Sequence, residues 1–427
     1  MRRRWLVALH VAQAAFLFWI AWRGDFCCDA YYYLHTGQRL LREGIAYHDD
    51  FAGYRSYLVP LVFGLLDLIP APSMRGSGQS IPFTLGAAFV AASVAASLHV
   101  LRRESAGRYL TFAIPVLFNP FLLAHVPAPL QESVVMIACV PLLFVLLAVR
   151  ERSPYATVGL AALVVSLAFT IRGSMAWLAL PLAIFVALEA RRAPARWREA
   201  SKAKLAALAA GVFVALIAPQ SLIMAQKLGT LDPYPRRWIV DQQAMFGVEM
   251  FKYATLKHEG KWKGLRFHTP YDSLPLEKKT FAFYRENTGP AVLLVVTHVW
   301  AGLHYDVLTT YVKMSDLKIL NVWIVLSSLV VAWGILGLLR YCRDPAERSR
   351  GMLLASMLVL SCGYTAFAGV EARFGMLGFL ALSLGAAQLF SSPGGRTVVR
   401  SSLPLALAYA VLCLAFNGLL LYTTPEI

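Results

Sequence analysis

Apolar stretches of 17–22 residues recur from one end of the chain to the other, separated by shorter polar segments. As a helix, a stretch of that length spans the hydrocarbon core of a bilayer, which is about 30 Å thick. The pattern predicts an all-α integral membrane protein with about 11 transmembrane helices. The predicted spans are 5–22, 81–101, 109–125, 134–149, 155–171, 174–190, 205–225, 320–340, 352–369, 374–390 and 402–422.

Arg and Lys gather in alternate polar segments, and such loops face the cytoplasm. Every basic cluster lies inside only if two apolar stretches, 57–70 and 291–303, do not cross the membrane. The first is short and ends in proline, and His298 interrupts the second. Both are predicted to be re-entrant or interfacial helices. The N-terminus is then inside and the C-terminus outside.

This topology divides the chain into three parts. Residues 1–225 are predicted to form a transmembrane module with a first outer loop at 23–80, and this module holds most of the candidate functional residues described below. Residues 226–319 form a long outer loop with interfacial helices, and residues 320–427 form the C-terminal transmembrane helices.

Composition narrows the class of protein further. The chain is 58% hydrophobic and 15% charged, whereas soluble domains are about 25% charged. The net charge of +16 does not indicate nucleic acid as a partner, because the basic residues lie in loops between spans. Six cysteines are too few for a disulfide framework. Membrane lipids are the expected surroundings.

Ionisable residues at the outer ends of spans are the candidate functional residues, because charge near hydrocarbon is costly unless it is paired or faces a wet cavity. All of these residues lie on the same side of the membrane in the predicted topology. This arrangement predicts a lateral cavity that opens to the outer leaflet. They are Asp25 and Asp29 in RGDFCCDAYYYLHTGQ, Asp49 and Asp50 in AYHDDF, Glu132 in VPAPLQES, Arg172 in FTIRGS, and Glu371 with Arg373 in GVEARFGM.

Each residue also has a structural interpretation. Asp29 is expected to cap a helix at 30–43, which Gly44 would end. Asp25 and the Asp49–Asp50 pair are in positions where solvated surface acids are common. Glu132 and Arg172 could neutralise each other, as could Glu371 and Arg373.

Taken in order, these segments resemble the GT-C superfamily of polyprenyl-phosphate-dependent glycosyltransferases. The similar segments are CDAYYYLHTGQRLLREGIAYHDDF, GYRSYLVPLVFGLL, FNPFLLAHVPAPLQES, AFTIRGSMAWLALPL and VEARFGMLGFLALSLGA. They cover most of residues 1–225 and 360–390. In such families an acid of the first outer loop is proposed as the general base. The resemblance therefore implies Asp29, with Asp25 as its competitor. Many members have contiguous acids instead, which leaves Asp49 and Asp50 open.

The chemistry of such a transfer assigns roles to further residues. A carboxylate deprotonates the acceptor hydroxyl, and arginines stabilise the leaving phosphate. Tyr32 and Tyr33 could stack on the sugar or anchor their helix, and His298 with His304 is structural or contacts the acceptor rather than binding a metal. The candidate phosphate-binding and substrate-binding arginines are Arg55, Arg172, Arg236, Arg237 and Arg373. The sequence points to no particular cofactor, and a divalent cation stays an open alternative.

The predicted function is a glycosyltransferase of a bacterial inner membrane, with its active site facing the periplasm. Its partners would be a polyprenyl-phosphate sugar and a glycan or lipid acceptor of the cell envelope. Two alternatives stay open: a flippase or transporter of lipid-linked sugars, and a ligase or polymerase that transfers whole lipid-linked glycans. Transporters typically have repeats and charges near the bilayer midplane, whereas here the candidate residues lie on one side.

Overall fold

A computed structural model describes residues 2–23, 29–44, 56–69, 80–235, 238–258, 261–303, 317–367 and 375–423. The chain divides into two compact units, Met1–Arg236 (unit 1) and Arg237–Ile427 (unit 2). Segment 238–303, from the predicted long outer loop, packs within unit 2 together with the C-terminal helices.

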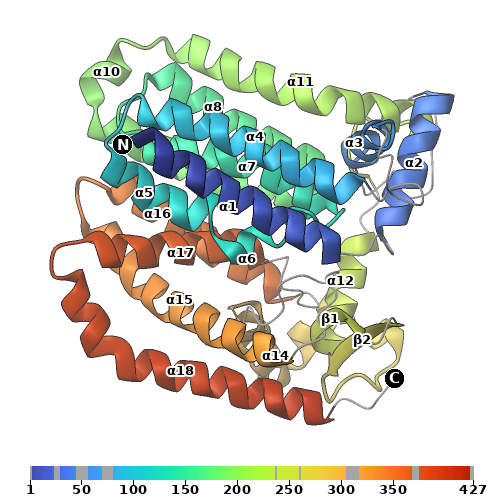
Figure 1. Cartoon of the computed structure of the whole chain (residues 1–427). Coiled ribbons are helices and arrows are strands. Elements are labelled where there is room, and N and C mark those ends of the chain that lie inside the picture. Colours follow the sequence, from blue (N-terminus) through green and yellow to red (C-terminus); the bar gives the residue numbers. More distant parts are fainter. Residues whose placement is uncertain are drawn as a thin grey trace. The chain divides into compact units, whose positions relative to one another are not determined.

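Unit 1 is helical throughout its described residues (Figure 1). Its helices are α1 (Arg2–Arg23), α2 (Asp29–Glu43), α3 (Leu58–Asp67), α4 (Ile81–Leu101), α5 (Ala106–Leu117), α6 (Pro120–Leu123), α7 (Gln131–Ala148), α8 (Pro154–Ile171), the 3₁₀ helix η2 (Gly173–Leu178), α9 (Ala179–Arg192), α10 (Pro194–Arg198) and α11 (Lys202–Leu228).

Three helices of unit 1 that begin at the same end of the unit have the same kind of N-terminal cap, a serine side chain. Ser105, Ser153 and Ser201 precede α5, α8 and α11, and each side chain accepts a hydrogen bond from the backbone N–H three residues further on. The serine oxygens therefore satisfy N–H groups that a helix start leaves without an intrahelical partner.

Unit 2 packs five long helices with a smaller mixed region. The elements are α12 (Trp238–Glu249), β1 (Met250–His258), β2 (Lys261–His268), the 3₁₀ helix η3 (Leu276–Lys278), α13 (Phe281–Glu286), α14 (Thr288–Leu303), α15 (Leu317–Arg343), α16 (Arg348–Thr365), α17 (Met376–Ser391) and α18 (Gly395–Thr423). Helix α17 packs against α15 through Gly334 and Gly385. A Cβ on Gly334 would lie 2.5 Å from the carbonyl oxygen of Leu382, so these helices approach more closely than larger residues would allow.

The β1–β2 hairpin adds two strands to a chain predicted as all-α, within the segment predicted as a long outer loop with interfacial helices. The two strands are antiparallel, with a register that runs from Met250 opposite His268 to His258 opposite Lys261. A partial sequence signal is present: a two-residue connection containing Gly joins two segments that each hold two of the aromatic residues Phe, Tyr and Trp. The mixed charges of this stretch had suggested a loop instead.

Nine helices in the described residues are long and apolar enough to cross a membrane, which makes the chain a multi-pass membrane protein. They are 4–22, 81–101, 106–123, 131–148, 154–171, 173–192, 202–228, 322–343 and 395–416. Two further predicted spans correspond to α16 and α17. Helix α16 begins with a polar RSR sequence, and the 16 residues of α17 reach about 24 Å, short of a bilayer core. Helices α3 and α14, with 10 and 16 residues, are also shorter than a bilayer core.

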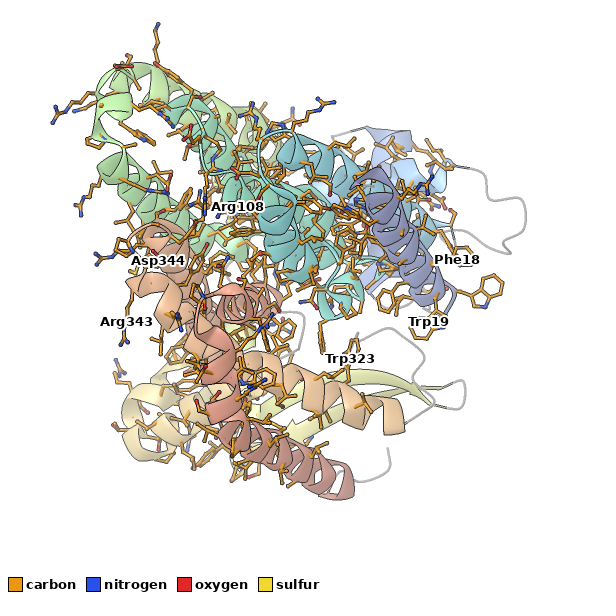
Figure 2. The ribbon with its side chains drawn as sticks, turned by 60° about the vertical axis from the view of Figure 1, so that its left-hand side comes forward. Phe18, Trp19, Arg108, Trp323, Arg343 and Asp344 are labelled. Carbon is orange, nitrogen blue, oxygen red and sulfur yellow. The ribbon has the colours of Figure 1, made fainter. Side chains whose placement is uncertain are left out.

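The side chains of α1 distinguish the two ends of unit 1. Phe18 and Trp19 project away from the C-terminal half of α1 (Figure 2) and are 58% and 41% exposed. Aromatic side chains of this kind favour the level of the lipid headgroups. At the other end of the unit, the Arg108 Nε donates to the carbonyl oxygen of Ala148 over 2.7 Å, which ties α5 to the end of α7.

Candidate functional site

The end of unit 1 that carries α2 and α3 brings together segments that lie far apart in the sequence (Figure 1). We call it the α2–α3 end. The backbone N–H of Tyr57, just before α3, donates to the Gln220 side-chain oxygen on α11 over 3.0 Å. The amide nitrogen of Gln220 donates to the Pro233 carbonyl oxygen, also over 3.0 Å. Gln220 is only 1% exposed, so both ends of its amide are satisfied away from water.

Glu132 lies in the first turn of α7 and is 3% exposed. The proline-rich segment 127–129 cannot continue a helix, and α7 therefore starts only at Gln131. A carboxylate in the first turn is favoured because the free N–H groups and the helix dipole present positive charge there. The sequence thus places a buried acid at the α2–α3 end where local electrostatics supports it.

Arg172 ends α8 and has an extended backbone, with φ −148° and ψ 108°. Its guanidinium pairs through Nη1 with Oε1 of Glu132. Its Nε donates to Oγ of Ser174 over 2.9 Å. A cation is favoured at a helix C-terminus for the same reason that an acid is favoured at the start. The dipoles of α7 and α8 therefore both support this pair.

The Glu132–Arg172 pair is largely shielded from water, with side chains 4% and 13% exposed. Bringing two charges out of water cancels much of their attraction, so a buried pair adds little net stability by itself. Removing one partner is different, because it leaves an uncompensated charge and costs about 3–5 kcal/mol. The main effect of the pair is therefore to fix the position of the Arg172 guanidinium.

Tyr234 packs against the turn that carries Arg172. Its hydroxyl lies 2.9 Å from the carbonyl oxygen of Phe169 and 2.8 Å from that of Thr170, both in the last turn of α8. A Cβ at Gly173 would lie 2.9 Å from the Tyr234 ring, so only glycine leaves room for this contact. Burial raises the pKa of Tyr234 well above its usual value, which keeps the phenol protonated and able to donate.

Helix α2 begins at Asp29, the carboxylate in its first turn, and ends before Gly44, which has a φ of 79°. The predicted end of the helix before Gly44 is confirmed, and the helix begins one residue earlier than predicted, with Asp29 in its first turn rather than as a cap before it. The three tyrosines that follow Asp29 have different surroundings. Tyr31 is 57% exposed and Tyr32 is half-buried, whereas Tyr33 is 2% exposed and its ring meets Phe63 of α3 edge-on at 5.9 Å. Tyr33 therefore anchors α2 on α3.

Helices α2 and α3 pack backbone to backbone through Gly37 and Gly64. A Cβ at Gly64 would lie 2.7 Å from the Gly37 carbonyl, and a Cβ at Gly37 would overlap the carbonyl oxygen of Pro60. The Gln38 side-chain nitrogen donates to Oδ2 of Asp67 over 2.7 Å. This close contact holds α2 and α3 together as one element, and it thereby fixes the position of Asp29 at the start of α2.

Several predicted site residues lie outside the described residues, and the structure makes no statement about them. They are Asp25, Asp49, Asp50, Arg55, Arg236, Arg237, His304, Glu371 and Arg373.

His298 lies in unit 2 and is fully buried. Its Nδ1 is 3.0 Å from the carbonyl oxygen of Ala366, and its Nε2 is 3.1 Å from that of Met250. Burial lowers the pKa of His298 by more than these carbonyl oxygens raise it. The ring joins α14 to the start of β1 and to the end of α16. Of the two roles predicted for His298, structural or in contact with the acceptor, these contacts favour the structural one.

Sequence reasoning missed Tyr57, Ser174, Gln220 and Tyr234. The signal for Gln220 was an amide inside an otherwise apolar predicted span, 205–225. Tyr234 belongs to the segment DPYPRRW, in which the sequence analysis singles out Arg236 and Arg237.

A second missed feature is a polar network within the spans of α1, α4 and α5. Nδ1 and Nε2 of His10 lie 2.9 Å from Oε1 of Gln13 and 3.3 Å from Oγ of Ser97. Gln13 donates to the carbonyl oxygen of Leu117 over 2.7 Å, and the Tyr109 hydroxyl donates to Ser97 over 3.0 Å. Such hydrogen bonds join helices within hydrocarbon, which accounts for these residues structurally.

Nowhere in the described ranges does a group of three or more His, Cys, Asp and Glu side chains gather as metal ligands would. The chain matches no protein-family model, no curated protein and no solved structure. Any function must therefore be argued from the site.

Proposed function

We propose that this protein is a GT-C-type glycosyltransferase that moves a sugar from a polyprenyl phosphate to a glycan or lipid acceptor of the cell envelope. The reaction would take place on the outer face of a bacterial inner membrane. The observation that supports this best is Arg172, a guanidinium fixed at the end of a span-length helix, at the end of unit 1 that also carries Asp29. A lipid phosphate entering from the bilayer would meet a cation there.

The proposed step needs one base and one cation. The Asp29 carboxylate takes the proton of an acceptor hydroxyl while that oxygen attacks the anomeric carbon of the sugar. The bond from this carbon to the phosphate oxygen breaks, and its electron pair stays on the phosphate. Polyprenyl phosphate leaves with one more negative charge, which Arg172 stabilises.

Arginine suits this role because its planar guanidinium matches phosphate oxygens as a fork. Glu132 and Ser174 act here as positioning residues, since their contacts with Nη1 and Nε set the plane of that fork. A cation already in place needs no reorganisation as the leaving group gains charge. The rigid α2–α3 pair would hold Asp29 in the same way.

The test is a release assay on the purified full-length protein. Radiolabelled polyprenyl-phosphate sugars are supplied with an envelope lipid extract as acceptor, and free polyprenyl phosphate is measured. We expect Asp29→Asn to slow release by about 10²–10⁴-fold, the usual contribution of a general base. Glu43→Gln is the matched control, because it neutralises an exposed acid at the other end of α2.

Four other outcomes would distinguish the alternatives. Loss of release with Asp49→Asn but not Asp29→Asn would keep the transferase and move the base to the contiguous pair. Donor binding without release for any sugar would refute the transferase. Movement of the intact donor across a proteoliposome membrane would then favour the flippase, and transfer of a whole lipid-linked glycan would favour the ligase.

A further inference from the structure

Helices α8, α9 and α11 enclose a groove with a volume of about 560 Å³. Its wall is almost entirely apolar and consists mainly of small side chains, among them Val158, Ala162, Ala183, Ala187, Ala190 and Ala210. Ala183, Ala187 and Ala210 are exposed, so the groove opens sideways from unit 1. All three helices belong to candidate spans, which means that the opening faces hydrocarbon.

The length of the groove matches one leaflet. On α9 the lining runs from Ala179 to Ala190. Eleven steps of 1.5 Å give about 17 Å, close to half of a hydrocarbon core about 30 Å thick. A single acyl chain is therefore the kind of molecule that the groove accommodates.

Basic residues continue the groove at its α10 end. On α9, Arg191 follows Ala183 and Ala187 at intervals of four, and residues at that spacing share a helix face. On α11, Lys202 precedes the lining residue Ala209 by seven residues, a spacing that keeps two residues on one helix face. Six basic residues and two acids lie between 189 and 204. The arginine and the lysine thus extend the apolar lining into a positively charged mouth.

This positive charge is not balanced within the described part of the chain. Arg191, Arg198, Lys202 and Lys204 are exposed, and none of them forms an ion pair with another described residue. The two lysines occupy the first turn of α11, which holds no acid. Cations are disfavoured there because the helix dipole already presents positive charge. An external anion at this position would remove the conflict.

We propose that the α8–α9–α11 groove and its basic mouth bind one anionic glycerophospholipid, with the phosphate at Arg191 and Lys202 and one acyl chain along the groove. Anionic headgroups are attracted to basic residues at the cytoplasmic surface, and basic pockets between transmembrane helices bind them. The half-buried Trp197 on α10 lies between the two cations in sequence and suits the headgroup level.

This lipid site is separate from the proposed reaction. In unit 1, α10 lies at the opposite end from α2 and α3 (Figure 1). The lipid would therefore occupy the other leaflet, and its binding does not depend on the glycosyltransferase proposal.

The test is native mass spectrometry of the full-length protein after delipidation in a neutral detergent. Dioleoyl phosphatidylglycerol, dioleoyl phosphatidylcholine and glycerol 3-phosphate are titrated separately. We expect one phosphatidylglycerol to bind in preference to phosphatidylcholine. Arg191→Gln with Lys202→Gln should weaken it about 25-fold, since each cation near a membrane surface contributes about 5-fold. Arg396→Gln with Arg400→Gln, on exposed positions of α18, is the matched control.

A second pair of variants tests the groove. Ala183→Leu with Ala187→Leu fills the groove and should weaken phosphatidylglycerol binding about 10-fold or more, whereas Ala215→Leu, on an exposed face of α11 outside the groove, should not. Equal binding of the two lipids, competition by glycerol 3-phosphate at the same concentration, or unchanged binding by the filled groove would each overturn the proposal.

Discussion

The Glu132–Arg172 pair makes a quantitative prediction about stability. Glu132→Gln keeps the shape of the side chain and its carbonyl-type oxygen towards Arg172 but removes the negative charge. The Arg172 side chain is only 13% exposed, so its guanidinium then lies largely away from water and lacks the charge of Glu132. Loss of one partner of a buried pair costs about 3–5 kcal/mol. Because the amide oxygen still accepts a hydrogen bond and Ser174 still contacts Nε, we expect about 3 kcal/mol, roughly a 150-fold change in the folding equilibrium.

Equilibrium unfolding in mixed detergent micelles, followed by tryptophan fluorescence, measures this change. Arg172→Gln should cost a similar amount, since it leaves the Glu132 carboxylate buried without its counter-charge. The double variant should be more stable than the sum of the two single losses predicts, because it leaves no unbalanced charge. Glu43→Gln serves as the control, since its pair with Arg39 is exposed to solvent and to salt screening.

Unfolding of Glu132→Gln at the same mole fraction of denaturing detergent as the parent would contradict this prediction. It also fails if the two single losses are simply additive, because the residues would then not act as a pair.

Three more changes test the architecture. Gly37→Ala should destabilise unit 1 by about 1–3 kcal/mol by forcing α2 off α3; thermal unfolding checks this, and Gly107→Ala, which meets nothing within 4 Å, should be silent. Tyr234→Phe keeps the ring but removes the hydroxyl at the end of α8, and a loss of about 1 kcal/mol is expected; an unchanged midpoint would contradict it. His298→Gln should flatten the pH dependence of unfolding: the folded pKa is lowered, so the neutral ring contributes stability above about pH 6.5 that is lost as the pH falls below it. Equal pH profiles for parent and variant would count against this contact.

The sequence determined the helical membrane class and most of the helix positions. A span is recognised locally, because bilayer thickness sets the length of an apolar stretch and the stretch satisfies its own backbone. The limits of α2 were equally local, since an acid begins the helix and Gly44 ends it. Where the pattern was mixed, as in β1 and β2, local cues competed, and the sequence pattern did not predict the hairpin.

The contacts between side chains were decided by tertiary structure. Glu132 and Arg172 are 40 residues apart, and Tyr57 and Gln220 are 163 apart. The sequence indicated that a charge near hydrocarbon needs a partner and offered Glu132–Arg172 as one possible pair, which the structure confirms. It did not indicate the contact of Tyr57 with Gln220, because side-chain contacts between helices depend on rotation and depth that hydropathy does not encode.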